Sequence, residues 1–324
     1  MRKGICFKKT VSVIALCLLA VLNGCSSENE DPEKKKEFRS QGLEFMRNGD
    51  YASAENAFEM ALKQSNGIVR RIDIDICYYL GVCEVKLSEY DEAIDTFSAI
   101  AGIDDTQEDA FYMRGKVELM KGEKEAALSD FDRAVSIAPS RYVLYQKIYA
   151  DLCDYGYESE AGAYIGKAVS ENEKMGDYQH GVFSYYLGDY DEARNYLEKA
   201  RNQKNDDPKL IACLGRCYDE LGDTAYAISL YQAFIDGNGA NAAIYNELGM
   251  VKLKSSDLNG ALEAFQKGIE LEDEGSMQSL KFNEIVTLER MGEFSRAKAS
   301  MESYMREYPA DRVAGREYEF LKSR

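Results

Sequence analysis

Residues 111–139 read FYMRGKVELMKGEKEAALSDFDRAVSIAP, and the architecture follows from the pattern in this segment. Two helical segments flank Gly122, and their marked positions are Phe111, Gly115, Ala127 and Phe131. Side chains three, four and seven residues apart share one face of a helix, so each segment is expected to bury one stripe. Small residues at 115 and 127 allow two helices to approach closely. The segment therefore predicts a helix–turn–helix hairpin.

The same skeleton recurs along the chain at intervals close to 34 residues, the distance from Gly81 to Gly115. Gly-Asp-Tyr stands between the two helical segments of a repeat at residues 49–51 and 188–190, where the glycine can end one helix in the left-handed conformation and the aspartate can cap the next. One hairpin cannot bury its apolar face alone, so neighbouring hairpins are expected to stack. Eight copies align on the glycine of the first helix, or on the residue that replaces it: Gly42, Gly81, Gly115, Tyr149, Gly181, Gly215, Gly249 and Ile285.

This pattern resembles the tetratricopeptide repeat (TPR), a helix–turn–helix unit of 34 residues. The resemblance implies an all-α, right-handed solenoid of about eight repeats over residues 35–311, followed by a C-terminal capping helix over residues 312–324. With only four prolines in 324 residues, the composition also favours long helices. Ala127 and Ala193, in the second helices of their repeats, are expected to be close-contact positions.

The first 25 residues, MRKGICFKKTVSVIALCLLAVLNGC, have a different character. A basic start precedes an uncharged run from Val11 to Leu22 that is short for a membrane-spanning helix, which predicts a signal peptide over residues 1–24. Leu22 to Cys25 resembles the lipobox of bacterial lipoproteins, which implies lipid attachment at Cys25, a flexible tether over residues 25–34, and export to a cell membrane. The alternative is an ordinary signal peptide with an incidental cysteine.

The charge balance argues against a nucleic-acid partner, because a phosphate backbone would be repelled. The chain carries a net charge of −17, and without the four cations of residues 1–24 it would hold 36 Lys and Arg against 57 Asp and Glu, about −21. Five cysteines follow Cys25 without a CxxC motif, which is unlike a disulfide framework. Cys213 and Cys217, four residues apart, are interpreted as small buried side chains rather than metal ligands.

No catalytic constellation is evident in the sequence. His180 is the only histidine, it stands where other repeats have leucine, and it is expected to pack between helices. The glycines are spread along the chain rather than clustered in a phosphate-binding loop. We therefore expect no enzyme activity, no cofactor and no metal.

The TPR resemblance implies that first-helix residues line a concave groove. Nine basic and six acidic residues fall on such positions, among them Lys254, Arg290, Asp219 and Glu220. We expect a peptide with an apolar centre to bind there, and the alternative is that the tyrosines pack the repeats together. The residues predicted for this groove are Tyr78, Tyr112, Lys116, Tyr178, Val182, Tyr185, Tyr186 and Arg216.

These features together predict a membrane-anchored scaffold or adaptor of the bacterial cell envelope that binds proteins or peptides. Two other functions fit the same sequence. One is a solute- or glycan-binding lipoprotein, although the chain has no tryptophan to stack on sugars. The other is an assembly factor for an outer-membrane or pilus machine, which the sequence does not separate from an adaptor.

Overall fold

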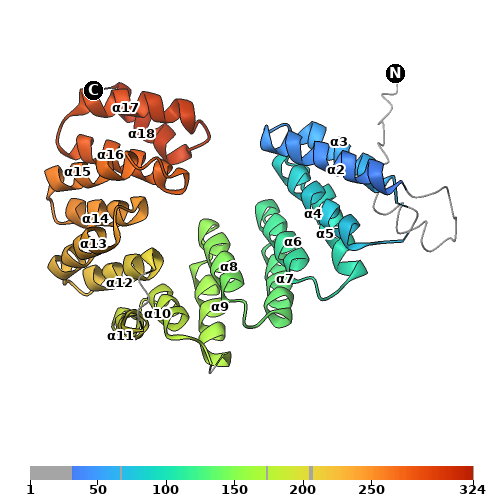
Figure 1. Ribbon diagram of the computed structural model, residues 1–324, viewed down its shortest axis with the longest axis horizontal. Helices are drawn as coiled ribbons and strands as arrows, with labels where there is room; N and C mark the ends of the chain where they lie inside the picture. The colour runs from blue at the N-terminus through green and yellow to red at the C-terminus, as the bar shows by residue number, and fades with distance from the viewer. Residues whose placement is uncertain (1–30, 66–67, 173, 204–206, 324) are drawn as a thin grey trace, which may run out of the picture. The chain divides into compact units, whose positions relative to one another are not determined.

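The computed structural model describes residues 31–65, 68–172, 174–203 and 207–323. The signal peptide predicted for residues 1–24 and the lipid site at Cys25 lie outside these ranges. The described residues form seventeen helices and no strand, which confirms the all-α class. The helices make eight consecutive hairpins and one further helix, and the chain divides into two compact units at Ala168 (Figure 1).

The first unit contains four hairpins, of which the last helix, α9, runs three residues past the division. Consecutive helices from α2 to α8 pack together, as α2 does on α3 and α3 on α4. Its helices are α2 (Pro32–Arg47), α3 (Tyr51–Leu62), α4 (Arg71–Lys86), α5 (Tyr90–Ile103), α6 (Glu108–Lys121), α7 (Lys124–Ile137), α8 (Tyr142–Asp154) and α9 (Glu158–Glu171).

The second unit contains four more hairpins and a last helix. Its even-numbered helices α10 to α16 also pack against one another, so the first helices of its hairpins form one layer. Its helices are α10 (Asp177–Tyr186), α11 (Tyr190–Asn202), α12 (Pro208–Glu220), α13 (Thr224–Asn238), α14 (Ala242–Lys254), α15 (Leu258–Ile269), α16 (Glu274–Arg290), α17 (Phe294–Glu307) and α18 (Arg312–Lys322).

The turns inside the hairpins have the expected chemistry. Gly49 and Gly188 are left-handed, with φ of 74° and 78°. The next residue caps the second helix: the Asp50 carboxylate accepts a hydrogen bond from the Ser53 N–H at 3.1 Å, and Asp189 does the same for Glu192. Two hairpins lack the glycine and place Ser88 and Ser256 in the left-handed region instead, with φ of 64° and 67°.

The close approach of the two helices occurs at the glycine of the first helix. A Cβ atom built on Gly81 would lie 2.6 Å from the ring of Phe97, and one on Gly115 would lie 3.0 Å from the carbonyl oxygen of Ala127. Ala127 and Ala193 are both fully buried, as expected for close-contact positions. In the six hairpins that have this glycine, the close approach depends on the absence of a side chain, whereas Tyr149 and Ile285 replace it in the other two.

The start of the first helix differs from the expectation of a tether over residues 25–34. Helix α2 begins at Pro32, because Asp31 caps it and proline is favoured in the first turn of a helix. Lys35, in a run of three lysines that suggests a solvated segment, is 1% exposed, and its Nζ lies 2.9 Å from the carboxylate of Asp73 in α4. This contact ties α2 to the second hairpin.

The last helix, α18, packs on α17. Ala314 and Leu321 are buried in a cluster with Met301 and Tyr304 of α17, and the Tyr304 hydroxyl donates to Asp311, the N-cap residue of α18, at 2.7 Å. Val313 and Phe320, on the same helix, are exposed and do not belong to this cluster. None of the helices in the described ranges is long and apolar enough to span a bilayer.

The close approach at glycine leads to a test with a matched control. Gly81→Ala should lower the free energy of unfolding by about 1–3 kcal/mol, because the new methyl group overlaps the buried ring of Phe97. Gly162→Ala, in α9, meets no atom within 4 Å and should raise it by up to about 1 kcal/mol through helix propensity. Urea unfolding followed by circular dichroism measures both. Equal stabilities of the two variants would contradict the packing described.

Candidate functional site

A pocket of about 730 Å³ opens on the layer of first helices in the second unit. It spans four consecutive hairpins, because it takes residues from α10, α12, α14 and α16. Its lining combines apolar side chains, amides and charges of both signs. The residues that line it are Tyr185, Arg216, Asp219, Glu220, Asn246, Glu247, Met250, Val251, Leu253, Lys254, Ser279, Phe282, Asn283 and Arg290.

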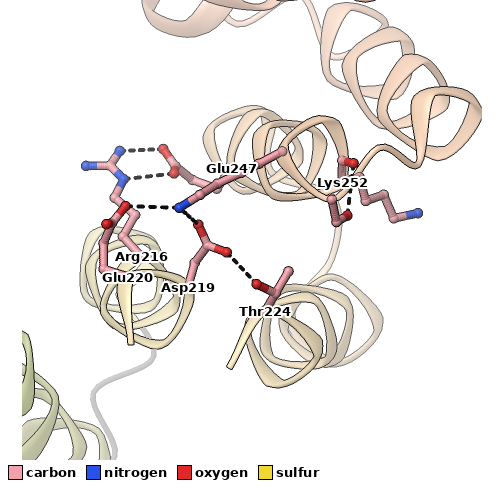
Figure 2. A network of polar contacts seen from close by, with 8 residues as sticks. Arg216, Asp219, Glu220, Thr224, Glu247 and Lys252 are labelled. Carbon is pink, nitrogen blue, oxygen red and sulfur yellow. Dashed lines mark hydrogen bonds and ion pairs between the residues drawn. The ribbon is translucent and has the colours of Figure 1, made fainter. Parts of the chain in front are cut away.

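The cations and carboxylates of α12 and α14 pair across the two hairpins (Figure 2). The guanidinium of Arg216 donates two hydrogen bonds to the Glu247 carboxylate, one of them from Nε to Oε2 at 2.8 Å. This carboxylate raises the pKa of Arg216 above its ordinary value. Glu247 is only 9% exposed, so Arg216 provides the charge that its buried carboxylate needs.

A second pair runs in the opposite direction along the same two helices. The Nζ of Lys254 lies 2.7 Å from an oxygen of Asp219 and 3.3 Å from one of Glu220. The other oxygen of Asp219 accepts a hydrogen bond from Thr224 at 2.8 Å (Figure 2). The walls formed by α12 and α14 are therefore close to neutral, although they carry five charged groups.

Between these pairs the pocket is apolar and has one pair of amides. Met250 is 43% exposed and lies with Leu253 and Phe282 in the lining. The Asn283 amide donates to the Asn246 side-chain carbonyl at 2.9 Å, which leaves the NH₂ of Asn246 and the carbonyl oxygen of Asn283 able to bond elsewhere. Such an arrangement can bind a peptide backbone beside an apolar side chain.

The predicted aromatic residues of α10 are brought together at one end of this layer. The ring of Tyr185 lies 6.2 Å from that of Tyr186 and 5.5 Å from that of Tyr190. Tyr185 lines the pocket, and burial raises its pKa to about 12. Tyr178 is partly buried, whereas Val182 is 6% exposed and belongs to the core.

In the first unit a smaller pocket, of about 330 Å³, lies on the corresponding helices α4, α6 and α8. It contains Tyr78 and Tyr112, but Tyr112 is 5% exposed and its hydroxyl donates to Asp151 at 2.6 Å. Lys116 pairs with the other oxygen of Asp151 at 2.7 Å. The Tyr112 hydroxyl and the Lys116 ammonium are therefore both bonded within the protein, and Tyr112 acts mainly as a link between α6 and α8.

The predicted site residues thus divide into three groups. Tyr185 and Arg216 line the larger pocket, and Tyr78 and Tyr112 line the smaller one. Neither set of lining residues includes Lys116, Tyr178, Val182 or Tyr186. Lys116 and Arg216, both predicted for the groove, each pair with a carboxylate of the next hairpin.

The prediction missed several lining residues, and the repeat register indicates two of them. Asn246 stands three residues before Gly249, the position that Tyr78 and Tyr112 hold before their own glycines. Met250 directly follows Gly249, as Lys116 and Arg216 follow theirs. Asn283 has no such signal, because it lies beside the position held by Phe282.

Other candidate groups fit packing roles. Cys213 and Cys217 are buried, and no disulfide is present among the described residues. His180 stacks on Tyr196 with 3.8 Å between ring centroids. In the part of the chain that the structure describes, no three His, Cys, Asp or Glu side chains gather as a metal site.

Two family models, both described as tetratricopeptide repeat, match residues 39–108 and 185–246. TPR repeats are therefore present in each unit. Among curated proteins, the chain is similar to "BBSome complex member bbs-4" of Caenorhabditis elegans, with 26% identity over 163 residues. The match covers 47% of this chain and 35% of the nematode protein, so the chain spans about a third of that relative.

Solved structures show the same fold. A tetratricopeptide repeat protein from Parabacteroides merdae is similar with a TM-score of 0.53 and 18% identity, over 79% of this chain and 99% of that one. PilW, a type IV pilus biogenesis factor, is similar with a TM-score of 0.42 and 16% identity, over 65% of this chain and 99% of that one. At 18% identity the likeness to the Parabacteroides merdae structure concerns the fold alone, and it confirms the TPR solenoid class.

The roles of the tyrosines can be separated by removing single hydroxyl groups. Tyr112→Phe should lower the free energy of unfolding by about 1–3 kcal/mol, because the buried Asp151 carboxylate loses a hydrogen bond. Tyr185→Phe should change it by less than about 0.5 kcal/mol, because the Tyr185 hydroxyl bonds to no described residue. Chemical denaturation of both variants measures this difference. A marked loss for Tyr185→Phe would mean that the Tyr185 hydroxyl makes a structural hydrogen bond.

Proposed function

We propose that this chain is an adaptor that binds a peptide segment of a partner protein on the first-helix layer of its second unit. The observation that carries the proposal is the 730 Å³ pocket, which is open across four hairpins and has an apolar centre between ion-paired walls. A non-catalytic role agrees with the TPR repeats found in both units, since these repeats generally serve as scaffolds for protein interactions.

The chemistry of the pocket favours a peptide over a small solute. Met250 and Phe282 offer an apolar surface, and the amide pair Asn246–Asn283 offers one donor group and one acceptor, the complement of a peptide bond. A glycan site would require several convergent polar groups and a stacking aromatic ring. Most charged groups here already pair with each other, and the chain has no tryptophan.

The proposed cellular setting rests on the N-terminal sequence. Cys25 follows an apolar run and a Leu-Asn-Gly segment, which resembles the lipidation site of bacterial lipoproteins. Two acyl chains hold a protein stably on a membrane, whereas one chain holds it only marginally. We infer an exported adaptor, anchored by lipid at the outer face of the cytoplasmic membrane or at an outer membrane.

Partner capture tests the proposed surface. Met250→Gln keeps the size of an exposed side chain but makes the pocket centre polar, so the amount of specifically captured partner should fall at least about fivefold. Met60→Gln is the matched control, because Met60 is 41% exposed in α3 and lines neither pocket. The measurement is quantitative mass spectrometry of proteins retained from detergent extracts by the two variants and the wild type.

The same experiment separates the alternative functions. A partner that belongs to a secretion or pilus machine would make the protein an assembly factor that uses this surface. Retention of no protein at all by the wild type would favour the solute binder and contradict the adaptor. Capture that is equal for Met250→Gln and Met60→Gln would place the binding surface elsewhere.

Lipidation is tested independently of partner binding. In the native host, Cys25→Ala should leave an unprocessed precursor and abolish labelling by a fatty-acid analogue, because the thiol that takes the diacylglyceryl group is gone. Cys77→Ala serves as the control, because Cys77 is buried in the core of the first unit. Normal maturation and membrane retention of Cys25→Ala would exclude the anchor.

A further inference from the structure

Arg290 differs from the other charged residues of the pocket. It is the last residue of α16, it is exposed, and it lines the pocket of the second unit. Its one hydrogen bond is from Nη1 to the carbonyl oxygen of Leu253, at a long 3.5 Å. The guanidinium thus lies over the C-terminal turn of α14, with most of its five N–H donors unused.

The remaining charges of the pocket are matched. Arg216 holds Glu247, and Lys254 holds Asp219 and Glu220, so five of the six charged groups in the lining pair with each other. Arg290 forms an ion pair with no carboxylate in the described ranges. The adjacent Glu289 forms no ion pair with Arg290, and burial raises the pKa of Glu289 to about 7.

The repeat register explains why this cation is left over. Glu220, Lys254 and Arg290 each stand five residues after the close-contact position of successive hairpins, at Gly215, Gly249 and Ile285. Lys254 reaches back to Glu220 of the preceding hairpin, at 3.3 Å. The equivalent contact for Arg290, with its counterpart in the preceding hairpin, would be with Lys254, which carries the same charge. The row of ion pairs therefore ends on an unmatched guanidinium at the edge of an apolar surface.

We propose that this pocket selects a segment of a partner protein in which an aspartate or glutamate lies close to a bulky apolar residue, and that Arg290 binds the carboxylate. This inference rests on the proposed function and gives its ligand a chemical class. The apolar side chain would cover Met250 and Leu253, and the carboxylate would reach the guanidinium beside them. Arginine presents a planar fork of donors that matches a carboxylate in two parallel hydrogen bonds.

Competing anions fit this surface less well. A nucleic acid would face a chain of net charge −17 over its whole length, whereas one side-chain carboxylate needs only one cation. The apolar part of the pocket also adds nothing to the binding of a bare phosphate. The distribution of charged and apolar groups in the pocket therefore favours a mixed acidic and apolar segment over a polyanion.

A peptide library tests the selection directly. The full chain, purified in detergent, is incubated with a positional-scanning library of dodecapeptides that are acetylated and amidated, so that only side chains carry charge. The wild type should enrich Asp or Glu within three residues of Leu, Ile, Phe or Met, and Arg290→Glu should weaken these peptides at least about tenfold and favour Lys or Arg at the acidic position. Arg306→Glu, an equal charge change at an exposed residue of α17, should keep the wild-type preference.

The outcomes separate the inference from the proposed function. If Met250→Gln abolishes binding but Arg290→Glu leaves the acidic preference unchanged, the pocket binds peptides and the assignment of Arg290 is wrong. If Arg306→Glu shifts the preference as much as Arg290→Glu, the effect is one of net charge and the inference fails. If the wild type enriches no peptide relative to Met250→Gln, the proposed function itself fails.

Discussion

The contact that sets the geometry of this protein is an apolar side chain of one helix lying against the bare Cα of a glycine in the preceding helix. Phe58, Phe97 and Leu197 each lie sixteen residues after their glycine, and a Cβ atom on any of these three glycines would come within 2.6 Å of the side chain. This constant interval fixes how two helices pair. The stacking of hairpins, and the layer that carries the pocket, follow from it.

Regular stacking brings polar groups of neighbouring hairpins together at similar intervals. Lys116 meets Asp151 and Arg216 meets Glu247, which stand 35 and 31 residues further along the chain. Each carboxylate is largely buried, so removing its partner would leave a charge without compensation. These pairs orient the hairpins, and they also withdraw most of the charge of the first-helix layer from any ligand. Selectivity must then come from the groups left over.

The sequence was sufficient to predict the features that depend on residues close together along the chain. The glycine spacing and the Gly-Asp-Tyr turns predicted the hairpins correctly, because helix caps and close contacts need those residue types at those places. It was not sufficient for contacts set by the rotation of one hairpin on the next. Lys35 stands in a run of three lysines, which gives no sign of burial, and only its contact with Asp73 explains why it is buried. For the same reason, the pairing of Arg216 with Glu247 could not be foreseen.

A nearly neutral pocket on an acidic chain has a consequence for how a partner is recognised. The net charge of −17 repels an acidic segment at long range, whereas Arg290 attracts its carboxylate only at contact. Salt at physiological strength screens charges beyond about 8 Å and affects close, partly buried pairs much less. Added salt therefore reduces the repulsion more than the attraction. On the proposed function, recognition would depend on apolar burial and one matched ion pair rather than on electrostatic steering, which would favour slow, selective association over rapid capture.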